Sequence, residues 1–477
     1  MRYSSGSTEI CMRAAALICS LILLPLFLGA QQIDVSEIQK RAESGDSKAQ
    51  FSMGMVYALG EGVLQDHVEA AKWFRMAADQ GEMTAQRNLG AMYLNGLGVS
   101  KDDVEGAKMF RRAAEKGDST SQNELALLYA AGRGVTKNLT EAVRWFHKAA
   151  EQGNAIAQKN LGVLVLSGQG TAQDVPQAAE WFRKAAEQGL AQAQNEYARL
   201  LLAGQGVQVN PEQAIGWFIK AAEQGEAMAQ NNLGLLYFTG QGVERNDAEA
   251  LKWFRQAANG GVVQSIYYLG LMHANGRGVE KNMAEAAKFY RTAADRRDVL
   301  AQNQLGWLYE KGLGVEQSDP EAVKWYRMAA DAGYSLAQYN LGVMYKAGRA
   351  GEADPKVAFE WFLKAAQLGH SVAQNELGWL YERGQGVEQD HAKALQWYLR
   401  AAIQGLVMAQ HNVGIYYYNG RGVEKNLVEA YTWFSIASIS GNKDSIGSRD
   451  LLAKEMSPEQ ITQAQERMAA LLGKKVR

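Results

Sequence analysis

The sequence contains few residues whose types and spacing could support catalysis or metal binding. Its six histidines lie far apart, and no pair has the H-E-x-x-H or H-x-x-x-H spacing that places two imidazoles on one helical face. They are His67, His147, His273, His370, His391 and His411. Both cysteines, Cys11 and Cys19, lie in an apolar N-terminal segment. We therefore predict no metal site and no cofactor.

Nucleophilic catalysis has one candidate motif. Acyl-transfer enzymes of the penicillin-binding class combine S-x-x-K with S-D-N and K-T-G. The chain has a single S-x-x-K, from Ser440 to Lys443, and neither of the other two motifs. Gly-x-Gly pairs also recur, but they follow predicted helices rather than strands, so we interpret them as turns and not as phosphate-binding loops. These patterns predict a protein that is not an enzyme.

The main feature of the sequence is a repeat of 36 residues that occurs eleven times between Ala49 and Gly441 without insertion or deletion. Gln follows the small opening residue in every repeat except the seventh, where Ile266 stands. The opening residues are Ala49, Ala85, Ser121, Ala157, Ala193, Ala229, Ser265, Ala301, Ala337, Ala373 and Ala409. Such a period is typical of stacked arrays in which each repeat buries its apolar face against its neighbours.

Each repeat is predicted to form two helices. In the first, Ala49, Met53, Val56 and Tyr57 have the spacing of an amphipathic helix, which ends at a glycine. The second begins after an Asp, Asn or Ser that can cap its exposed amides. Three residues later, nine repeats carry the Glu or Gln of a capping box, and nine carry Trp at the Trp73 position, which we interpret as core. The sequence predicts an all-α, right-handed α/α superhelical solenoid of eleven helix-turn-helix repeats with helical caps.

The N-terminal segment differs from the repeats. Two arginines precede an apolar run from Ala14 to Leu28, and small residues close it, which is the layout of a secretory signal peptide. We expect cleavage near Ala30, with Met1 or Met12 as the start, and a periplasmic or secreted mature chain. An uncleaved anchor is the alternative, although a membrane-spanning helix needs about 20 apolar residues.

Charge and composition limit the partners. The formal net charge is -1, and acidic and basic residues are mixed along the chain, so no basic stripe favours nucleic acid or an anionic membrane. No cysteine follows residue 30, so the exported chain would be stabilised by packing alone. We predict a monomer. Its expected domains are a signal peptide at 1–30, a capping helix at 31–48, repeats at 49–441 and capping helices at 442–477.

The repeats share the pattern A-Q-x-x-L-G-x-x-Y-x-x-G-x-G-V, an Asp or Asn cap, and A-x-x-W-F-x-x-A-A-x-x-G. From Ala49 to Gly441 this resembles the Sel-1-like repeat of the tetratricopeptide-like superfamily. The resemblance implies a superhelix whose first helices line a concave groove for a protein or peptide. It also implies an adaptor or scaffold. Cysteine-rich relatives are linked to β-lactam binding or hydrolysis, but this chain lacks their paired cysteines.

One face of the first helices changes between the eighth and tenth repeats. Trp307 and Trp379 are the two tryptophans outside the Trp73 position, and charges of both signs accompany them. Exposed aromatic residues with a polar rim are typical of an interface hot spot. Packing between first helices is the alternative, because Leu127 holds the same position elsewhere. The predicted partner-binding residues are Trp307, Glu310, Lys311, Tyr339, Lys346, Trp379, Glu382 and Arg383.

These observations lead to two hypotheses of different classes. The first is an exported, non-enzymatic adaptor that acts in envelope regulation, complex assembly or host interaction. The second is a cell-wall-directed hydrolase or β-lactam-binding protein, which rests on the resemblance and on export. A covalent adduct of labelled penicillin on Ser440 would favour the second hypothesis.

Overall fold

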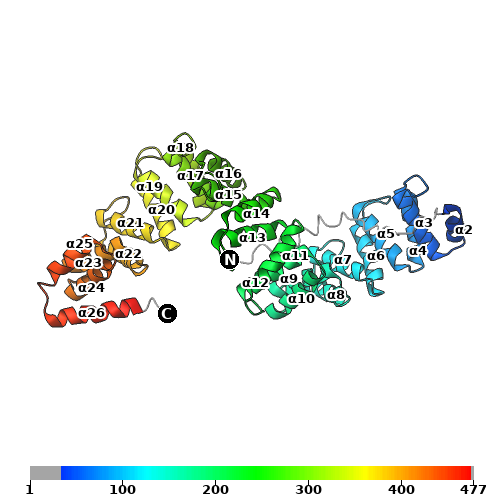
Figure 1. Ribbon diagram of the computed structural model, residues 1–477, viewed down its shortest axis with the longest axis horizontal. Helices are drawn as coiled ribbons and strands as arrows, with labels where there is room; N and C mark the ends of the chain where they lie inside the picture. Colours follow the sequence, from blue (N-terminus) through cyan, green and yellow to red (C-terminus); the bar gives the residue numbers. More distant parts are fainter. Residues whose placement is uncertain (1–33, 474–477) are drawn as a thin grey trace. The chain divides into compact units, whose positions relative to one another are not determined.

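The structure, a computed structural model, describes residues 34–473, and all regular secondary structure in this range is α-helical (Figure 1). The predicted signal peptide at residues 1–30 lies outside the described residues. The chain forms two compact units, an N-terminal unit that ends at Arg245 and a C-terminal unit that begins at Asn246. Among the described helices, none is both long enough and apolar enough to cross a membrane.

The described part of the N-terminal unit contains helices α2 to α13. Helix α2 precedes the repeats, and the others alternate between the first and the second helix of a repeat. Their bounds are α2 (Val35–Glu43), α3 (Ser47–Leu59), α4 (His67–Asp79), α5 (Met83–Asn95), α6 (Asp103–Glu115), α7 (Ser119–Ala131), α8 (Leu139–Glu151), α9 (Ala155–Ser167), α10 (Val175–Glu187), α11 (Ala191–Ala203), α12 (Pro211–Glu223) and α13 (Ala227–Thr239).

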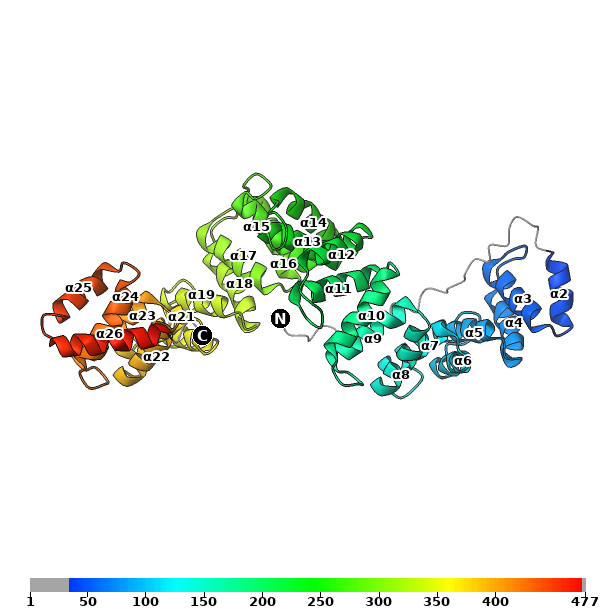
Figure 2. The same cartoon turned by 60° about the horizontal axis from the view of Figure 1, so that its bottom comes forward.

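The described part of the C-terminal unit contains helices α14 to α26, and the alternation continues until two further helices follow the last repeat (Figure 2). Their bounds are α14 (Asp247–Asn259), α15 (Val263–Asn275), α16 (Met283–Asp295), α17 (Val299–Lys311), α18 (Asp319–Asp331), α19 (Ser335–Lys346), α20 (Pro355–Gln367), α21 (Ser371–Arg383), α22 (His391–Ile403), α23 (Val407–Asn419), α24 (Leu427–Ser438), α25 (Lys443–Leu452) and α26 (Pro458–Gly473).

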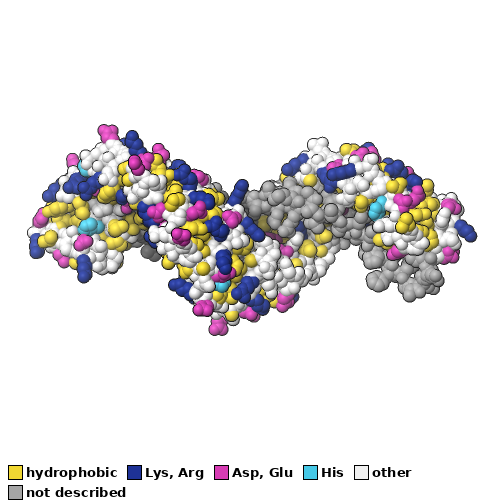
Figure 3. Space-filling view, turned by 90° about the horizontal axis from the view of Figure 1, so that it is seen from above, with side chains coloured by type: hydrophobic (Ala, Val, Ile, Leu, Met, Phe, Trp, Pro, Cys, Tyr) yellow, Lys and Arg dark blue, Asp and Glu magenta, His cyan; other side chains and the backbone are white. Residues whose placement is uncertain are grey.

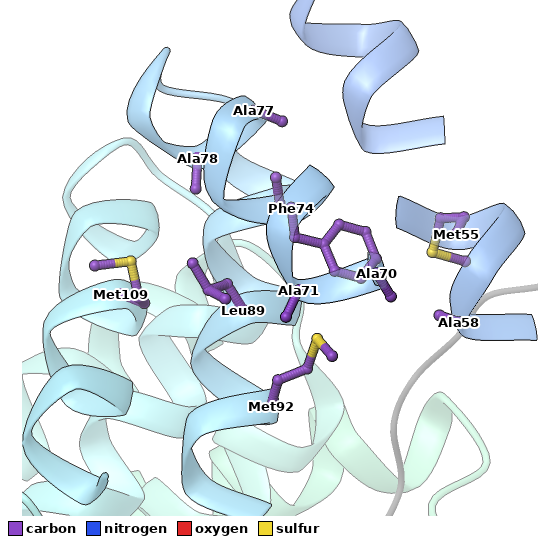
Figure 4. Close-up of a cluster of buried hydrophobic side chains, with 11 residues drawn as sticks. Met55, Ala58, Ala70, Ala71, Phe74, Ala77, Ala78, Leu89, Met92 and Met109 are labelled. Atoms are coloured by element: carbon purple, nitrogen blue, oxygen red, sulfur yellow. The ribbon is translucent and has the colours of Figure 1, made fainter. Parts of the chain in front are cut away.

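Each repeat buries its apolar residues between its two helices and the helix that follows. In the first repeat, Phe74 and Ala77 of α4 are fully buried, and Leu89 and Met92 of α5 belong to the same cluster (Figure 4). A Cβ added at Gly54 of α3 would lie 2.5 Å from the ring of Phe74. Glycine inside this helix costs about 1 kcal/mol relative to alanine. In return, it lets the aromatic ring of the second helix approach the first.

Caps define the helix ends. Asp66 accepts a hydrogen bond from the amide of Glu69 at 3.1 Å, and the side chain at this position caps the second helix of every repeat. First helices end at a left-handed glycine except in the ninth repeat, where Ala347 ends α19. The predicted capping box is wrong in eight of the nine repeats that carry its residues, because the amide of the capping residue donates to a carbonyl of the preceding helix. In the first repeat the amide of Asp66 donates to the carbonyl of Tyr57, and Glu69 bonds Lys72 instead.

A buried glutamine joins successive helices. In the third repeat, Gln122 donates to the carbonyl oxygen of Ala114 in the preceding second helix at 3.0 Å. Its own Oε1 accepts from Gln152, at the end of the second helix of the same repeat, at 2.7 Å. We call such a pair of glutamines a Gln clamp. The clamps are Gln50–Gln80, Gln122–Gln152, Gln158–Gln188, Gln194–Gln224 and Gln374–Gln404.

Five repeats have the first glutamine of the clamp without the second. In the second, sixth, eighth, ninth and eleventh repeats, the position of the second glutamine is held by Lys116, Gly260, Ala332, Leu368 and Ser440. In three of these repeats a buried Oε1 atom has no hydrogen-bond partner among the described residues, and these atoms belong to Gln86, Gln302 and Gln338. Because an unpaired buried acceptor costs about 1–3 kcal/mol, these junctions are held less firmly than those with a clamp.

We expect the change Ala332→Gln to stabilise the chain by about 1 kcal/mol, since it supplies a donor to the buried Oε1 of Gln302. Ala332 is exposed, so the longer side chain fits without repacking the core. The free energy of unfolding in urea measures the effect. Ala332→Glu is the matched control, because a carboxylate of nearly the same shape cannot donate. An equal gain from Glu would contradict the explanation.

Candidate functional site

The predicted partner-binding residues all lie on first helices of the C-terminal unit. Helix α17 carries Trp307, Glu310 and Lys311, helix α19 carries Tyr339 and Lys346, and helix α21 carries Trp379, Glu382 and Arg383. Two of the three repeats that carry these residues, the eighth and the tenth, are nearly identical over their first halves. The first 17 residues of the eighth and tenth repeats differ only at three pairs of positions, Gln304/Glu376, Lys311/Arg383 and Leu313/Gln385.

In the eighth repeat, Glu310 is the centre of a hydrogen-bond network that crosses two repeats. It accepts from the hydroxyl of Tyr326 in α18 at 2.8 Å and from Lys311 at 2.6 Å. It also accepts from Arg349 in the ninth repeat at 3.0 Å, and Arg349 binds Asp319 at 2.5 Å. We call Glu310, Tyr326 and Arg349 the first cluster. It fastens the ninth repeat to the eighth.

The tenth repeat contains a matching network, the second cluster. Glu382 accepts from the hydroxyl of Tyr398 at 2.9 Å and from Arg421 of the eleventh repeat at 3.2 Å. The two glutamates were predicted as a polar rim, but both are only slightly exposed and are engaged inside the protein. Sequence reasoning missed the tyrosines and arginines. The available signal was that Tyr replaces Phe in the second helix of both repeats that carry this glutamate.

The electrostatics of the first cluster keep Glu310 ionised. Burial alone would raise the pKa of this carboxyl, but hydrogen bonds from Lys311, Tyr326 and Arg349 outweigh it and lower the pKa. Burial, with the neighbouring carboxylate as a further cause, raises the pKa of Tyr326. The phenol therefore remains protonated and keeps donating to Glu310. This arrangement is structural and leaves no group free for proton transfer.

The two tryptophans differ in accessibility, although their repeats match. Trp307 is 39% exposed. Trp379 is partly buried and packs against two core clusters. The Nζ of Lys346 lies 3.9 Å from the centre of the Trp379 ring and forms an ion pair with Glu376 at 2.7 Å. Ala274 and Gln304 occupy the corresponding positions before Trp307, which explains why that ring is uncovered.

Between the tryptophans, Tyr339 is partly buried rather than fully open. Its ring stacks on His370 at 4.9 Å, and burial raises its pKa. Paired asparagines connect neighbouring first helices on this face. Asn340 donates to Asn303 at 3.0 Å, and Asn412 donates to Asn375 at 3.1 Å. The candidate site therefore consists of an open Trp307, a covered Trp379 and two amide pairs.

The possible catalytic motif does not form a site. Ser440 donates to the carbonyl oxygen of Ala437 at 2.8 Å, which closes the turn after α24, while Lys443 begins α25. Over residues 34–473, no group of three or more His, Cys, Asp or Glu side chains is placed to hold a metal ion. Charged side chains of both signs are intermixed on the face shown in Figure 3. What this region offers chemically is recognition by aromatic, amide and charged groups.

The geometry defines the class of protein, an α-solenoid of helix-turn-helix repeats. The family description "Sel1 repeat" matches eleven consecutive segments between residues 47 and 442. They are residues 47–82, 84–118, 119–154, 155–190, 191–226, 227–262, 263–298, 299–334, 335–370, 371–406 and 407–442. The chain belongs to the Sel1 repeat family.

Solved structures agree with this assignment. A protective antigen of uropathogenic Escherichia coli strains with an SLR fold is 34% identical, with a TM-score of 0.77 over 92% of this chain and 95% of that chain. A Sel1 repeat protein from Oxalobacter formigenes is 28% identical, with a TM-score of 0.54 over 72% of this chain and 95% of that chain. A comparison with curated proteins gave no match. Sel1 repeat proteins are generally protein–protein interaction scaffolds.

Proposed function

We propose that this chain is an exported, non-enzymatic adaptor that binds a protein partner on the first-helix face of its C-terminal unit. The family is one of scaffolds, and the N-terminal segment has the layout of a signal peptide. Roles in envelope regulation, complex assembly or host interaction are consistent with both. The similarity to a protective antigen of uropathogenic Escherichia coli strains, at 34% identity, is consistent with the role in host interaction.

The exposure of Trp307 is the observation that carries the proposal. A tryptophan that is 39% exposed leaves apolar surface in water, although the same helix position can hold a smaller residue, as Leu127 does in the third repeat. Tryptophan is enriched among residues that dominate binding energy at protein interfaces. The surrounding cluster fixes the helix that presents it, so the ring is positioned before a partner arrives.

We expect Trp307→Ala to weaken capture of the natural partner by about 2 kcal/mol, or roughly thirtyfold, while the melting temperature changes little. The measurement is a pull-down from envelope extract, followed by titration of the recovered partner. Trp325→Ala is the control for folding. Trp325 is only 3% exposed, so its loss should cost roughly 3–5 kcal/mol of stability.

Two results would contradict the proposal. The first is that Trp307→Ala recovers the partner with unchanged affinity, which would move the binding surface elsewhere. The second is that the purified mature chain hydrolyses nitrocefin or carries a penicillin adduct on Ser440. That result would support the enzyme hypothesis instead.

A further inference from the structure

The residues of the first and second clusters have a structural role inside the protein. The tryptophans on the same helices do not take part in these networks. Tyr326 and Arg349 both donate to Glu310 and thereby join two repeats. Trp307 is exposed instead, and its counterpart Trp379 recurs two repeats later on an equivalent helix. The C-terminal unit therefore presents the same aromatic group twice, at a spacing that the repeat array fixes.

Each tryptophan lies near a pair of asparagines that joins its helix to the next first helix. The acceptors, Asn303 and Asn375, are buried one helical turn before the tryptophan. The donors, Asn340 and Asn412, are partly exposed. A carboxamide has two donors and an acceptor with two lone pairs, so Asn340 and Asn412 keep hydrogen-bonding capacity beyond these bonds. Free main-chain amides of a ligand are the matching chemistry. An extended chain has them, whereas a helix uses its own internally.

A cation also recurs at the same position in both repeats. Lys311 and Arg383 each follow the tryptophan by four residues, so they lie on the same face one turn later. Arg383 is exposed and forms no ion pair among the described residues. Lys311 shares the carboxylate of Glu310 with Arg349 and Tyr326, so its charge is only partly compensated. Acidic groups on a ligand would complement both positions.

We propose that the C-terminal unit binds one extended polypeptide segment of its partner through Trp307 and Trp379 together. The inference rests on the proposed adaptor function and specifies its ligand. Packed helices lie about 8–10 Å apart, so equivalent first helices two repeats apart are separated by about 20 Å. An extended chain rises about 3.3 Å per residue. The segment therefore carries two apolar side chains about six residues apart, each with an acidic residue nearby.

The two positions are not equally ready to bind. Lys346 covers the Trp379 ring and is held there by Glu376, whereas the short side chain of Ala274 stands at the position that corresponds to Lys346 before Trp307. The ligand first contacts Trp307, and the second apolar side chain then displaces the Lys346 ammonium from the aromatic ring. Removing that side chain by Lys346→Ala should therefore strengthen binding, in contrast to the usual effect of truncating a residue within an interface.

A displayed library of random peptides of about 16 residues tests the proposal on the mature chain. We expect enriched sequences to contain two apolar residues five to seven positions apart with acidic neighbours. Fluorescence anisotropy of an enriched peptide should show a loss of about thirtyfold or more for Trp307→Ala, and tighter binding for Lys346→Ala. Arg199→Ala is the matched control, since it changes the same helix position in the fifth repeat and should leave the affinity unchanged. Thermal melting verifies that each variant is folded.

Several outcomes would contradict the proposal that the ligand is an extended segment. Apolar residues about 13 positions apart would indicate a helical ligand, because a helix rises 1.5 Å per residue. Enriched peptides with a single apolar anchor, no enrichment at all, or weaker binding by Lys346→Ala would each exclude the two-point arrangement. If the natural partner is nevertheless captured through Trp307, the adaptor function stands and only the form of its ligand changes. If capture of the natural partner does not depend on Trp307, both the proposed binding surface and the proposed extended ligand are wrong.

Discussion

The change Gly386→Ala should destabilise the chain by about 3 kcal/mol or more. Gly386 has a positive φ of +74°, and an added Cβ would lie 2.1 Å from the carbonyl oxygen of Pro355 at the start of α20. A left-handed backbone costs a residue with a side chain roughly 1–2 kcal/mol. The overlap adds about 1–3 kcal/mol because the backbone of one repeat must move away from that of another. The free energy of unfolding in urea measures the loss.

Gly369→Ala provides the matched control. Gly369 also has a positive φ, of +88°, but an added Cβ would have no atom within 4 Å. Only the cost of the left-handed backbone applies here, so the expected loss of unfolding free energy is roughly 1–2 kcal/mol. Equal losses at the two positions would show that the contact with Pro355 relaxes easily. In most of the Gly-x-Gly pairs, the second glycine is likewise required by close contact with the preceding repeat rather than by a phosphate ligand.

The second large effect has the opposite sign and depends on pH. Burial raises the pKa of Glu124 in α7 to about 7, although a hydrogen bond from Asn123 opposes the shift. Because this folded-state pKa lies above the unfolded value, Glu124 imposes no penalty below about pH 4.5, and the penalty grows until the pH exceeds about 7. One pKa unit corresponds to about 1.4 kcal/mol. We therefore expect Glu124→Gln to stabilise the chain by roughly 2–3 kcal/mol at pH 8 and hardly at all at pH 4.

The difference in unfolding free energy between variant and parent, measured in urea from pH 4 to pH 8, tests this expectation. Glu196→Gln is the control. Glu196 has the same repeat position in α11 but forms an ion pair with Arg199 at 2.7 Å, so neutralising it should bring no gain at any pH. A pH-independent gain at Glu124 would mean that the amide improves packing, and that ionisation is not the cause.

The fold could be read from the sequence because its signals are local. Asp66 and Gly60 define helix ends through contacts within one or two turns, and the 36-residue period repeats them eleven times. Gly54 likewise predicts a close approach, which Phe74 provides. Such local signals are sufficient to predict that the fold is all helical and where its helices begin and end. The capping box was wrong because the amide of Asp66 had a better acceptor in the preceding helix.

The candidate site was less predictable because its properties depend on neighbouring repeats. Sequence reasoning treated Trp307 and Trp379 as one case, yet only Trp379 lies beneath Lys346, which belongs to the preceding first helix. Glu310 looked like a surface charge because its partner Arg349 stands in the next repeat. Burial at one position of a solenoid is decided by residues one repeat away, and the pattern within a single repeat does not contain them.

The missing Gln clamps also bear on how the protein responds to force. At the junctions around Gln302 and Gln338, a buried acceptor is unpaired, whereas Gln374–Gln404 closes the junction that follows them. An adaptor fixed to one partner near each end behaves as a spring in series, and the weakest junction extends first under tension. Stretching should therefore begin in the eighth and ninth repeats and in the second, where Gln86 is unpaired in the same way. Since Trp307 and Tyr339 lie in the eighth and ninth repeats, mechanical load on the chain would alter the spacing between the two tryptophans and release a bound segment.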